Sequence, residues 1–192
     1  MLTDKTRLLI VQSVDDAIHN LFPKKYFSLC HAYAVVGASV ASIILDRRYR
    51  PVAGLAVIDC GAGHHLKLLD DKAFSCSKGG AYHCWIESVS QDGADKEIID
   101  IGFKNNRLYA KKHKIPWLKK DSSYLWGKYR EVVIDAELKD LPPIFPEGKL
   151  WLRETPEGAA WMNQHLDAHI NEYAKITAHV LRTIKHDMEA TA

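Results

Sequence analysis

The sequence lacks features that would place it at once among membrane or nucleic-acid-binding proteins. A membrane-spanning helix needs ~20 apolar residues, and the longest apolar run, residues 32–45, is shorter and contains Gly37, Ser39 and Ser42. The charge is nearly balanced, with 26 Lys and Arg against 24 Asp and Glu, so no basic stripe indicates a nucleic-acid partner. We therefore expect neither a membrane nor a nucleic acid as partner.

Cysteine is scarce, and no secretory signal accompanies it. The chain of 192 residues has four cysteines. Its first 20 residues carry acidic side chains early and lack the uninterrupted apolar core and cleavage-like end of a signal peptide. Few cysteines without an export signal argue against a disulfide framework. We expect a cytoplasmic protein whose thiols are free for chemistry.

What is present is the apolar content of an ordinary globular protein, 47% of the residues, in a chain of one-domain length. Helical spacing of apolar side chains predicts helices over residues 3–20, 28–45, 104–115 and about 157–187. Apolar and alternating runs predict strands over residues 51–60, 64–70, 81–89, 96–103 and 131–138. This order predicts an α+β fold with antiparallel strands. We expect one domain over residues 1–192, with the last helix as an appended element.

Cys30 stands where a polar segment becomes an apolar helix. If Ser28 caps that helix, Cys30 lies in its first turn. Backbone N–H groups there have no intrahelical partner, and the helix dipole favours an anion. The position therefore suits a thiolate, and its N–H groups suit the oxyanion of an acyl-transfer intermediate. Taken alone, Cys30 is better explained as a buried structural thiol.

A nucleophilic cysteine needs a base, and His83 is the best candidate. His31 follows Cys30 directly, so on a helix it points about 100° away and is not expected to face the thiol. His83 lies in a predicted strand and shares one strand face with Trp85 and Glu87. A histidine in such a strand needs a polar partner.

The next strand supplies that partner as Asp100. The residues Asp92 and Gly93 form a strong turn signal between the two strands. With a register in which Val89 pairs with Lys96, His83 and Asp100 are diagonal neighbours on one face, and a turn tightened by two residues would place them directly opposite each other. A slip of one residue would separate them onto opposite faces. In the good registers Asp100 orients the imidazole of His83, as in a nucleophile–base–orienter triad.

Several short stretches resemble transglutaminase-like proteins of the papain-like superfamily, in which cysteine, histidine and aspartate follow in this order. They are CHAYA (residues 30–34), RPVAG (50–54), HCWIE (83–87) and IID (98–100), and DIGF (100–103) is similar to the aspartate strand of arylamine N-acetyltransferases. The resemblance implies a papain-like fold in which a helix carrying the nucleophile packs on an antiparallel sheet.

The resemblance also implies a function. Cys30 would attack an amide or acyl substrate and form a thioester, His83 would move the proton, and Asp100 would orient His83. Tyr26 and Trp85 are expected to contact the substrate, and no cofactor is expected. The substrate would be a peptide, an amide or an acyl small molecule, with hydrolysis or transfer as the outcome. A binding module of the same fold without turnover is the alternative.

A zinc site is a further alternative. Cysteine and histidine crowd one region, at Cys60, His64, His65, Cys76, His83 and Cys84. Their spacing is not that of the close ligand pairs of structural zinc sites, so no metal is expected. His165 and His169 share one face of the last predicted helix, but the glutamate of a zinc-protease motif does not follow the first. We expect these two histidines on a solvated face. The sequence does not indicate an oligomeric state.

Overall fold

The structure is a computed structural model that describes residues 4–75, 80–89, 96–120 and 122–190. Its helices are α1 (Asp4–Leu21), α2 (Cys30–Leu45), α3 (Asn105–Lys112), α4 (Tyr129–Val132) and α5 (Pro156–Ala190), with short 3-10 helices η1 (Tyr26–Ser28), η2 (Asp71–Phe74) and η3 (Leu138–Asp140). Its strands are β1 (Tyr49–Gly61), β2 (His64–Leu68), β3 (His83–Ser88), β4 (Glu97–Asp100), β5 (Leu125–Lys128) and β6 (Leu150–Glu154).

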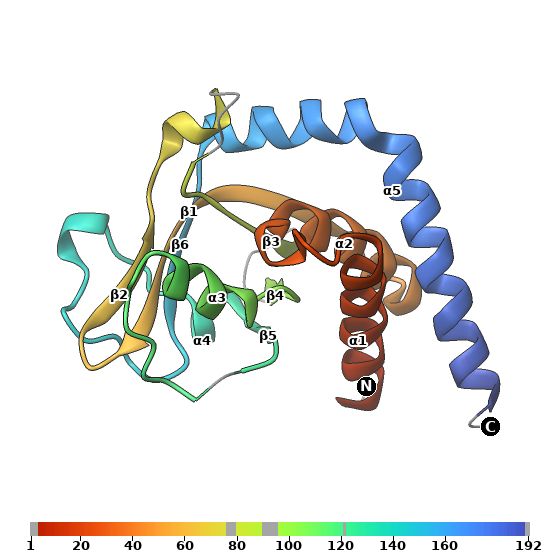
Figure 1. Ribbon diagram of the computed structural model, residues 1–192, viewed down its shortest axis with the longest axis horizontal. Helices are drawn as coiled ribbons and strands as arrows, with labels where there is room; N and C mark the ends of the chain where they lie inside the picture. The colour runs from red at the N-terminus through yellow and green to blue at the C-terminus, as the bar shows by residue number, and fades with distance from the viewer. Residues whose placement is uncertain (1–3, 76–79, 90–95, 121, 191–192) are drawn as a thin grey trace.

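The six strands form one curled antiparallel sheet in the order β2-β1-β3-β4-β5, with β6 also paired to β1. All the pairs between these strands are antiparallel. In Figure 1 the long strand β1 runs beside β2 and β6, α1 and α2 lie on the other side of the picture, and α5 begins above the strands and crosses the top toward those helices. The α+β class, the antiparallel sheet and the long C-terminal helix are therefore as predicted.

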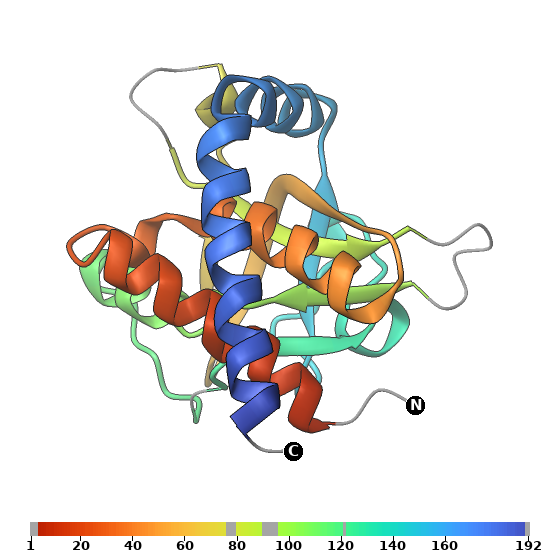
Figure 2. The ribbon, with the colours of Figure 1, turned by 90° about the vertical axis from the view of Figure 1, so that its right-hand side faces the viewer.

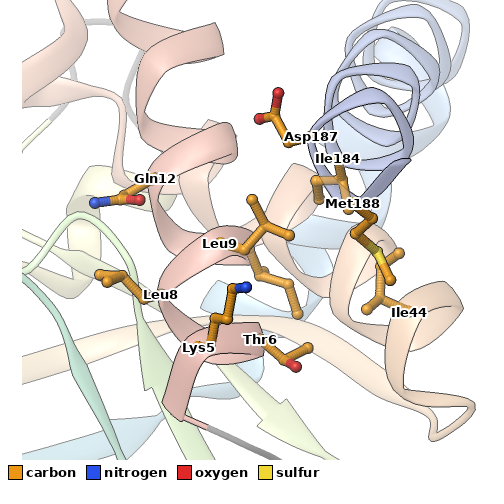
Figure 3. A pocket seen from close by; sticks show the side chains of 10 residues that line it. Lys5, Thr6, Leu8, Leu9, Gln12, Ile44, Ile184, Asp187 and Met188 are labelled. Carbon is orange, nitrogen blue, oxygen red and sulfur yellow. The ribbon is translucent and has the colours of Figure 1, made fainter. Parts of the chain in front are cut away.

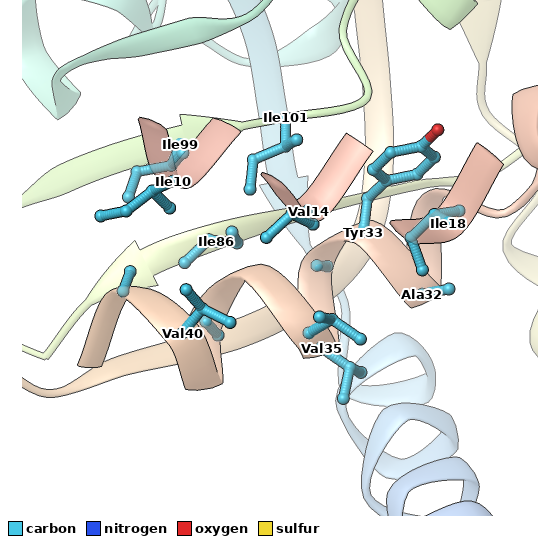
Figure 4. Packing of buried hydrophobic residues seen from close by; sticks show 14 of the residues in the cluster. Ile10, Val14, Ile18, Ala32, Tyr33, Val35, Val40, Ile86, Ile99 and Ile101 are labelled. Atoms are coloured by element: carbon cyan, nitrogen blue, oxygen red, sulfur yellow. The ribbon is translucent and has the colours of Figure 1, made fainter. Parts of the chain in front are cut away.

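The largest hydrophobic cluster lies between α2 and the sheet. Small residues let the helix approach closely, since a Cβ added at Gly37 would stand 2.7 Å from Ile86 Cδ1 and 2.6 Å from Ile101 Cδ1. Side chains of α1 fill the other side of the cluster, with Ile10 and Val14 facing the same group (Figure 4). Helix α2 is thus pressed against the strands on one face and covered by helices on another.

Helix α5 is bent rather than straight. His169 has non-helical backbone angles (φ −122°, ψ 17°). The first half lies across the top of Figure 1, and the second half descends past α1 and α2, as Figure 2 shows. Met162 in the first half and Val180 in the second are both buried in the cluster around α2. Both arms of α5 therefore contribute to the main core.

The segment between α3 and α5 differs from the prediction. The strand predicted over residues 131–138 is wrong, because residues 131 and 132 belong to α4 and only Val133 makes a bridge, to Leu150. Strands β5 and β6 were not predicted. The predicted turn at residues 92–93 lies outside the described residues. Among the described helices, none is long and apolar enough to cross a membrane.

Candidate active site

Cys30 is the first residue of α2 and is half-buried. The predicted cap at Ser28 is wrong, because Leu29 occupies the N-cap position and no side chain caps the helix. The Ser28 hydroxyl instead donates to the carbonyl oxygen of Lys25 at 2.9 Å. The thiol therefore lies one residue nearer the end of the helix than the sequence suggested.

The first backbone N–H groups of α2 precede the first N–H groups that donate hydrogen bonds within the helix. The amides of Ala32 and Tyr33 donate to the carbonyl oxygen of Leu29, at 2.9 and 3.2 Å. The amides of Cys30 and His31 precede them in the chain. Such groups carry the positive end of the helix dipole.

His83 and Asp100 form a buried hydrogen-bonded pair. Asp100 Oδ2 lies 2.8 Å from His83 Nε2, and each side chain is 4% exposed. Strands β3 and β4 pair Ile86 with Ile99, which is the diagonal one of the two registers that the sequence allowed. The two side chains are therefore diagonal neighbours on one face, as the hairpin argument required.

The surroundings of His83 favour its charged form. Burial alone disfavours an imidazolium, but the charge and hydrogen bond of Asp100 and the nearby Cys30 outweigh it, so the pKa of His83 is raised. The ring of Trp85 stacks against the imidazole with centroids 6.3 Å apart and planes at 21°. The Asp100 carboxylate thus binds one nitrogen of the His83 ring, and the Trp85 ring packs against its face.

The environment of Cys30 favours the thiolate. The pKa of its thiol is lowered well below the ordinary value, first by the hydrogen bond from the Cys84 thiol and then by His31 and His83, against the opposing effect of burial. His31 lies close enough to lower the pKa of the Cys30 thiol, and its ring packs against Trp161 and His165 of α5. The more exposed of the two thiols is therefore the one that ionises.

Cys30 and His83 border the same cavity, which has a volume of about 110 Å³. Its walls come from η1, α2, β2, β3, α3 and the segments beside them: Phe27, Ser28, Cys30, Leu68, Gly80, Tyr82, His83, Asn106 and Tyr109. Tyr82 lies just before β3, and the alternation of a strand would have placed it on the face opposite to His83. Nothing in the sequence pointed to Asn106 or Tyr109.

The two residues expected to contact substrate are placed elsewhere. Tyr26 lines a neighbouring cavity and stacks on His19, with ring centroids 4.2 Å apart. Trp85 is 1% exposed, and its indole N–H donates to Glu87 at 3.0 Å. Neither belongs to the walls of the cavity that Cys30 and His83 border.

A second group of aromatic and histidine rings lies between the start of α2 and the bend of α5. His165 stacks on Trp161 (centroids 4.9 Å apart), and its ring centroid lies 4.8 Å from that of His31. Its Nε2 lies 2.8 Å from the hydroxyl of Tyr173. Burial and the neighbouring histidines lower the pKa of His165 to about 4. The solvated face expected for His165 is therefore wrong.

No set of three or more histidine, cysteine, aspartate or glutamate side chains could hold a metal ion within the described part of the chain. Cys76, which the zinc alternative included, lies outside that part. A larger cavity of about 460 Å³ between α1, α2 and α5 is lined mainly by apolar side chains, such as Leu9 and Ile184, and has no cysteine or histidine in its walls (Figure 3). The cavity at Cys30 thus combines a thiol with an imidazole–carboxylate pair.

Comparison with known proteins supports the fold alone. No family model matches the sequence, and no curated protein matches it significantly. One solved structure, "The crystal structure of genomics APC5867", aligns with a TM-score of 0.61 and 17% sequence identity, covering 96% of this chain and 79% of that one. The chain therefore shares its overall architecture with a known structure whose name states no activity.

Proposed function

We propose that the protein is a cysteine-dependent hydrolase or acyltransferase that acts on an amide or acyl substrate through a thioester at Cys30. The observation that carries the proposal is the buried His83–Asp100 pair on the wall of the cavity that also holds the Cys30 thiol. The helix α2 begins with the nucleophile and packs on an antiparallel sheet that carries His83 and Asp100. This arrangement supports a papain-like fold.

The roles follow from the atoms. Asp100 binds Nε2 of His83, which leaves Nδ1 to exchange a proton with the thiol and the leaving group. The raised pKa of His83 and the lowered pKa of Cys30 both favour a thiolate–imidazolium pair. Such a pair is an activated nucleophile together with its general acid.

The proposed reaction has two halves. The Cys30 thiolate attacks the carbonyl carbon, a C–S bond forms, and the π electrons move to the oxygen. When the tetrahedral intermediate collapses, the bond to the leaving group breaks, and His83 gives that group a proton. Water or an amine then attacks the thioester, His83 takes a proton from it, and the C–S bond breaks to restore the thiolate.

The start of α2 also offers donors for the oxyanion. The backbone amides of Cys30 and His31 stand ahead of the first helical bond, at the positive end of the helix. Donors of this kind stabilise the tetrahedral intermediate.

The cavity points to a small or narrow acyl group. Its volume of about 110 Å³ is far below the ~300–1,000 Å³ of drug-sized ligand pockets. Tyr82, Tyr109 and Leu68 supply flat and apolar walls, and Asn106 supplies a polar one. A peptide, an amide or a small acyl donor therefore fits best when only its reacting end enters.

The test is the rate of iodoacetamide labelling against pH, read residue by residue through peptide mass mapping. Cys30 should titrate well below the ordinary cysteine pKa of ~8.5, and its labelled peptide should vanish in Cys30→Ala. Cys60→Ala is the matched control, because that thiol is fully buried in a separate cluster. Labelling of Cys30 at the ordinary pKa would contradict an activated nucleophile.

Turnover of a set of activated acyl esters and amides separates an enzyme from a binding module of the same fold. An enzyme should release the leaving group in an initial burst and leave an acyl adduct on Cys30, and Cys30→Ala should show neither. A thiol that titrates low but never carries an acyl group would favour the binding module.

A further inference from the structure

The Cys84 thiol is placed directly beside Cys30. Cys84 and Ile86 share a face of β3 because side chains alternate along a strand. Cys30 and Gly37 share a side of α2 because seven residues make about two helical turns. Gly37 packs against Ile86, so the same two faces bring Cys30 to Cys84. Cys84 belongs to the main hydrophobic cluster, and Cys30 packs against that cluster.

The two thiols differ in access. Cys30 is half-buried and borders the cavity, whereas Cys84 is 2% exposed and lies inside the main hydrophobic cluster. A reagent that enters the cavity therefore meets Cys30 first. Cys60 is also buried, but it packs in the other cluster, on the far side of the sheet from α2.

We propose that Cys30 and Cys84 form a reversible disulfide, with hydrogen peroxide as oxidant, and that this bond switches off the nucleophile. The disulfide needs only the two thiols, whereas its regulatory effect rests on the proposed function of Cys30. Hydrogen peroxide oxidises Cys30 first, and the Cys84 thiol then reacts with the oxidised Cys30 to form the disulfide.

The proposed chemistry balances in two steps. The Cys30 thiolate attacks one peroxide oxygen, the O–O bond breaks, hydroxide leaves, and Cys30 becomes a sulfenic acid. The Cys84 sulfur then attacks the Cys30 sulfur, an S–S bond forms, and the sulfenic oxygen leaves as water with the proton from Cys84. A dithiol reverses the change by reducing the disulfide and becoming oxidised itself.

The first step prepares the second. Burial keeps the Cys84 pKa well above its ordinary value, and the neighbouring Cys30 raises it further through its hydrogen bond and its charge. A sulfenic acid on Cys30 is neutral, so that repulsion disappears once Cys30 is oxidised. Cys84 is therefore a poor target for peroxide and becomes a better nucleophile when it is needed.

The proposed bond requires the two sulfurs to approach each other, and Cys30 stands at the end of α2, where a movement disturbs the fewest helical hydrogen bonds. It is the first residue of α2, and the chain before it is a single 3-10 turn with no side-chain cap on the helix. A small shift there alters one helix end and leaves the packing around Gly37 in place. A cysteine in the middle of the helix would lack this freedom.

The test treats the native protein with a few equivalents of hydrogen peroxide, blocks remaining thiols, and maps peptides without reduction. We expect a cross-linked pair of peptides containing Cys30 and Cys84, lower in mass by about 2 Da than the two reduced peptides together. Iodoacetamide labelling of Cys30 should be lost and should return after dithiothreitol. Cys60→Ala should behave like the wild type.

The variant Cys84→Ser sharpens the result. Without a resolving thiol, Cys30 should pass to sulfinic and sulfonic acid, and dithiothreitol should not restore its labelling. Over-oxidation of Cys30 in the wild type, or a disulfide that maps to Cys60 or Cys76, would overturn the proposal. If Cys84→Ser does not fold, the wild-type map still decides.

The outcome is separable from the proposed function. A mapped Cys30–Cys84 bond in a protein that turns over no acyl substrate would leave the disulfide standing and remove the enzyme. Burst turnover that survives peroxide, with no cross-link, would keep the enzyme and remove the switch.

Discussion

Strand β3 carries two buried ionic groups on one face, and they are built differently. Glu87, near one end of the strand, is 2% exposed and is surrounded by donors. Its carboxylate pairs with Arg50 at 2.9 Å and Lys96 at 2.6 Å, and it accepts the indole N–H of Trp85. Each carboxylate oxygen is thus occupied by the protein itself.

His83, at the other end, has a simpler arrangement. It binds Asp100 through Nε2 and borders the cavity that holds Cys30. A carboxylate closed in by two cations and an indole stabilises a structure, whereas a single pair that opens on a thiol leaves a nitrogen for chemistry. The comparison teaches that burial and charge do not by themselves mark a site. What marks the proposed site is the position of the ring nitrogen of His83 that Asp100 does not bind.

Replacing the base should produce the largest effect. Gln can still donate a hydrogen bond to Asp100, so His83→Gln keeps the buried carboxylate partnered while removing the group that moves protons. We expect kcat/KM for an activated acyl substrate to fall about 10³-fold, equal to about 4 kcal/mol of transition-state stabilisation. Steady-state kinetics would measure the loss, and a change of less than tenfold would remove His83 from the proposed role.

The closed cluster should respond in the opposite way. Glu87→Gln leaves Lys96 without its carboxylate partner and leaves Arg50 with Glu154 alone. Both cations are partly exposed to solvent, so the free energy of unfolding should fall by about 1 kcal/mol. Turnover per folded molecule should stay within a few-fold of the wild type. Urea unfolding and kinetics on the same preparation test both halves. If Glu87→Gln were as stable as the wild type but inactive, the Glu87 cluster would not have the purely structural role assigned to it.

An effect no larger is expected in the pH dependence of stability. The pKa of His83 is raised in the folded protein, above ~6.5 for a free imidazole. Its charged form therefore stabilises the fold fully below about pH 6.5, and that contribution is lost as the pH rises through the raised pKa. We expect the gap in unfolding free energy between the parent and His83→Gln to shrink by about 1 kcal/mol over that rise.

The measurement is best made in a Cys30→Ala background, because the lowered pKa of the Cys30 thiol changes stability with pH in the opposite direction. Urea unfolding is compared at several pH values for the single variant and for the double variant with His83→Gln. Parallel curves would show that the Asp100 contact does not favour the charged imidazole.

The sequence predicted the parts of the site that depend on local pattern. The register of β3 and β4 could be inferred because His83 and Asp100 stand at fixed distances from one turn, and only one parity of pairing buries the apolar residues together. The helix carrying Cys30 was evident from its small and apolar residues. Its cap was not, because the Ser28 hydroxyl prefers a carbonyl three residues back.

Features that depend on distant partners escaped the prediction. Strands β5 and β6 are only four and five residues long. Strand β6 forms by pairing with β1, which lies about a hundred residues earlier in the chain. The apolar run at residues 132–134 favours a strand by composition, yet α4 takes its first residue, since tertiary context overrides a weak preference. The cavity residues Asn106 and Tyr109 reach the site only through the fold.

The pairing of Gly54 with Glu154 has a consequence for synthesis. Cys30, His83 and Asp100 all precede β6 and α5 in the chain, so the strand that pairs with β1 and the helix that covers α2 emerge from the ribosome after the three proposed reactive residues. A nascent chain therefore carries its thiol before the apolar surface around α2 is sheltered. Chains that terminate before β6 would keep that surface exposed, which makes them substrates for chaperones and proteases.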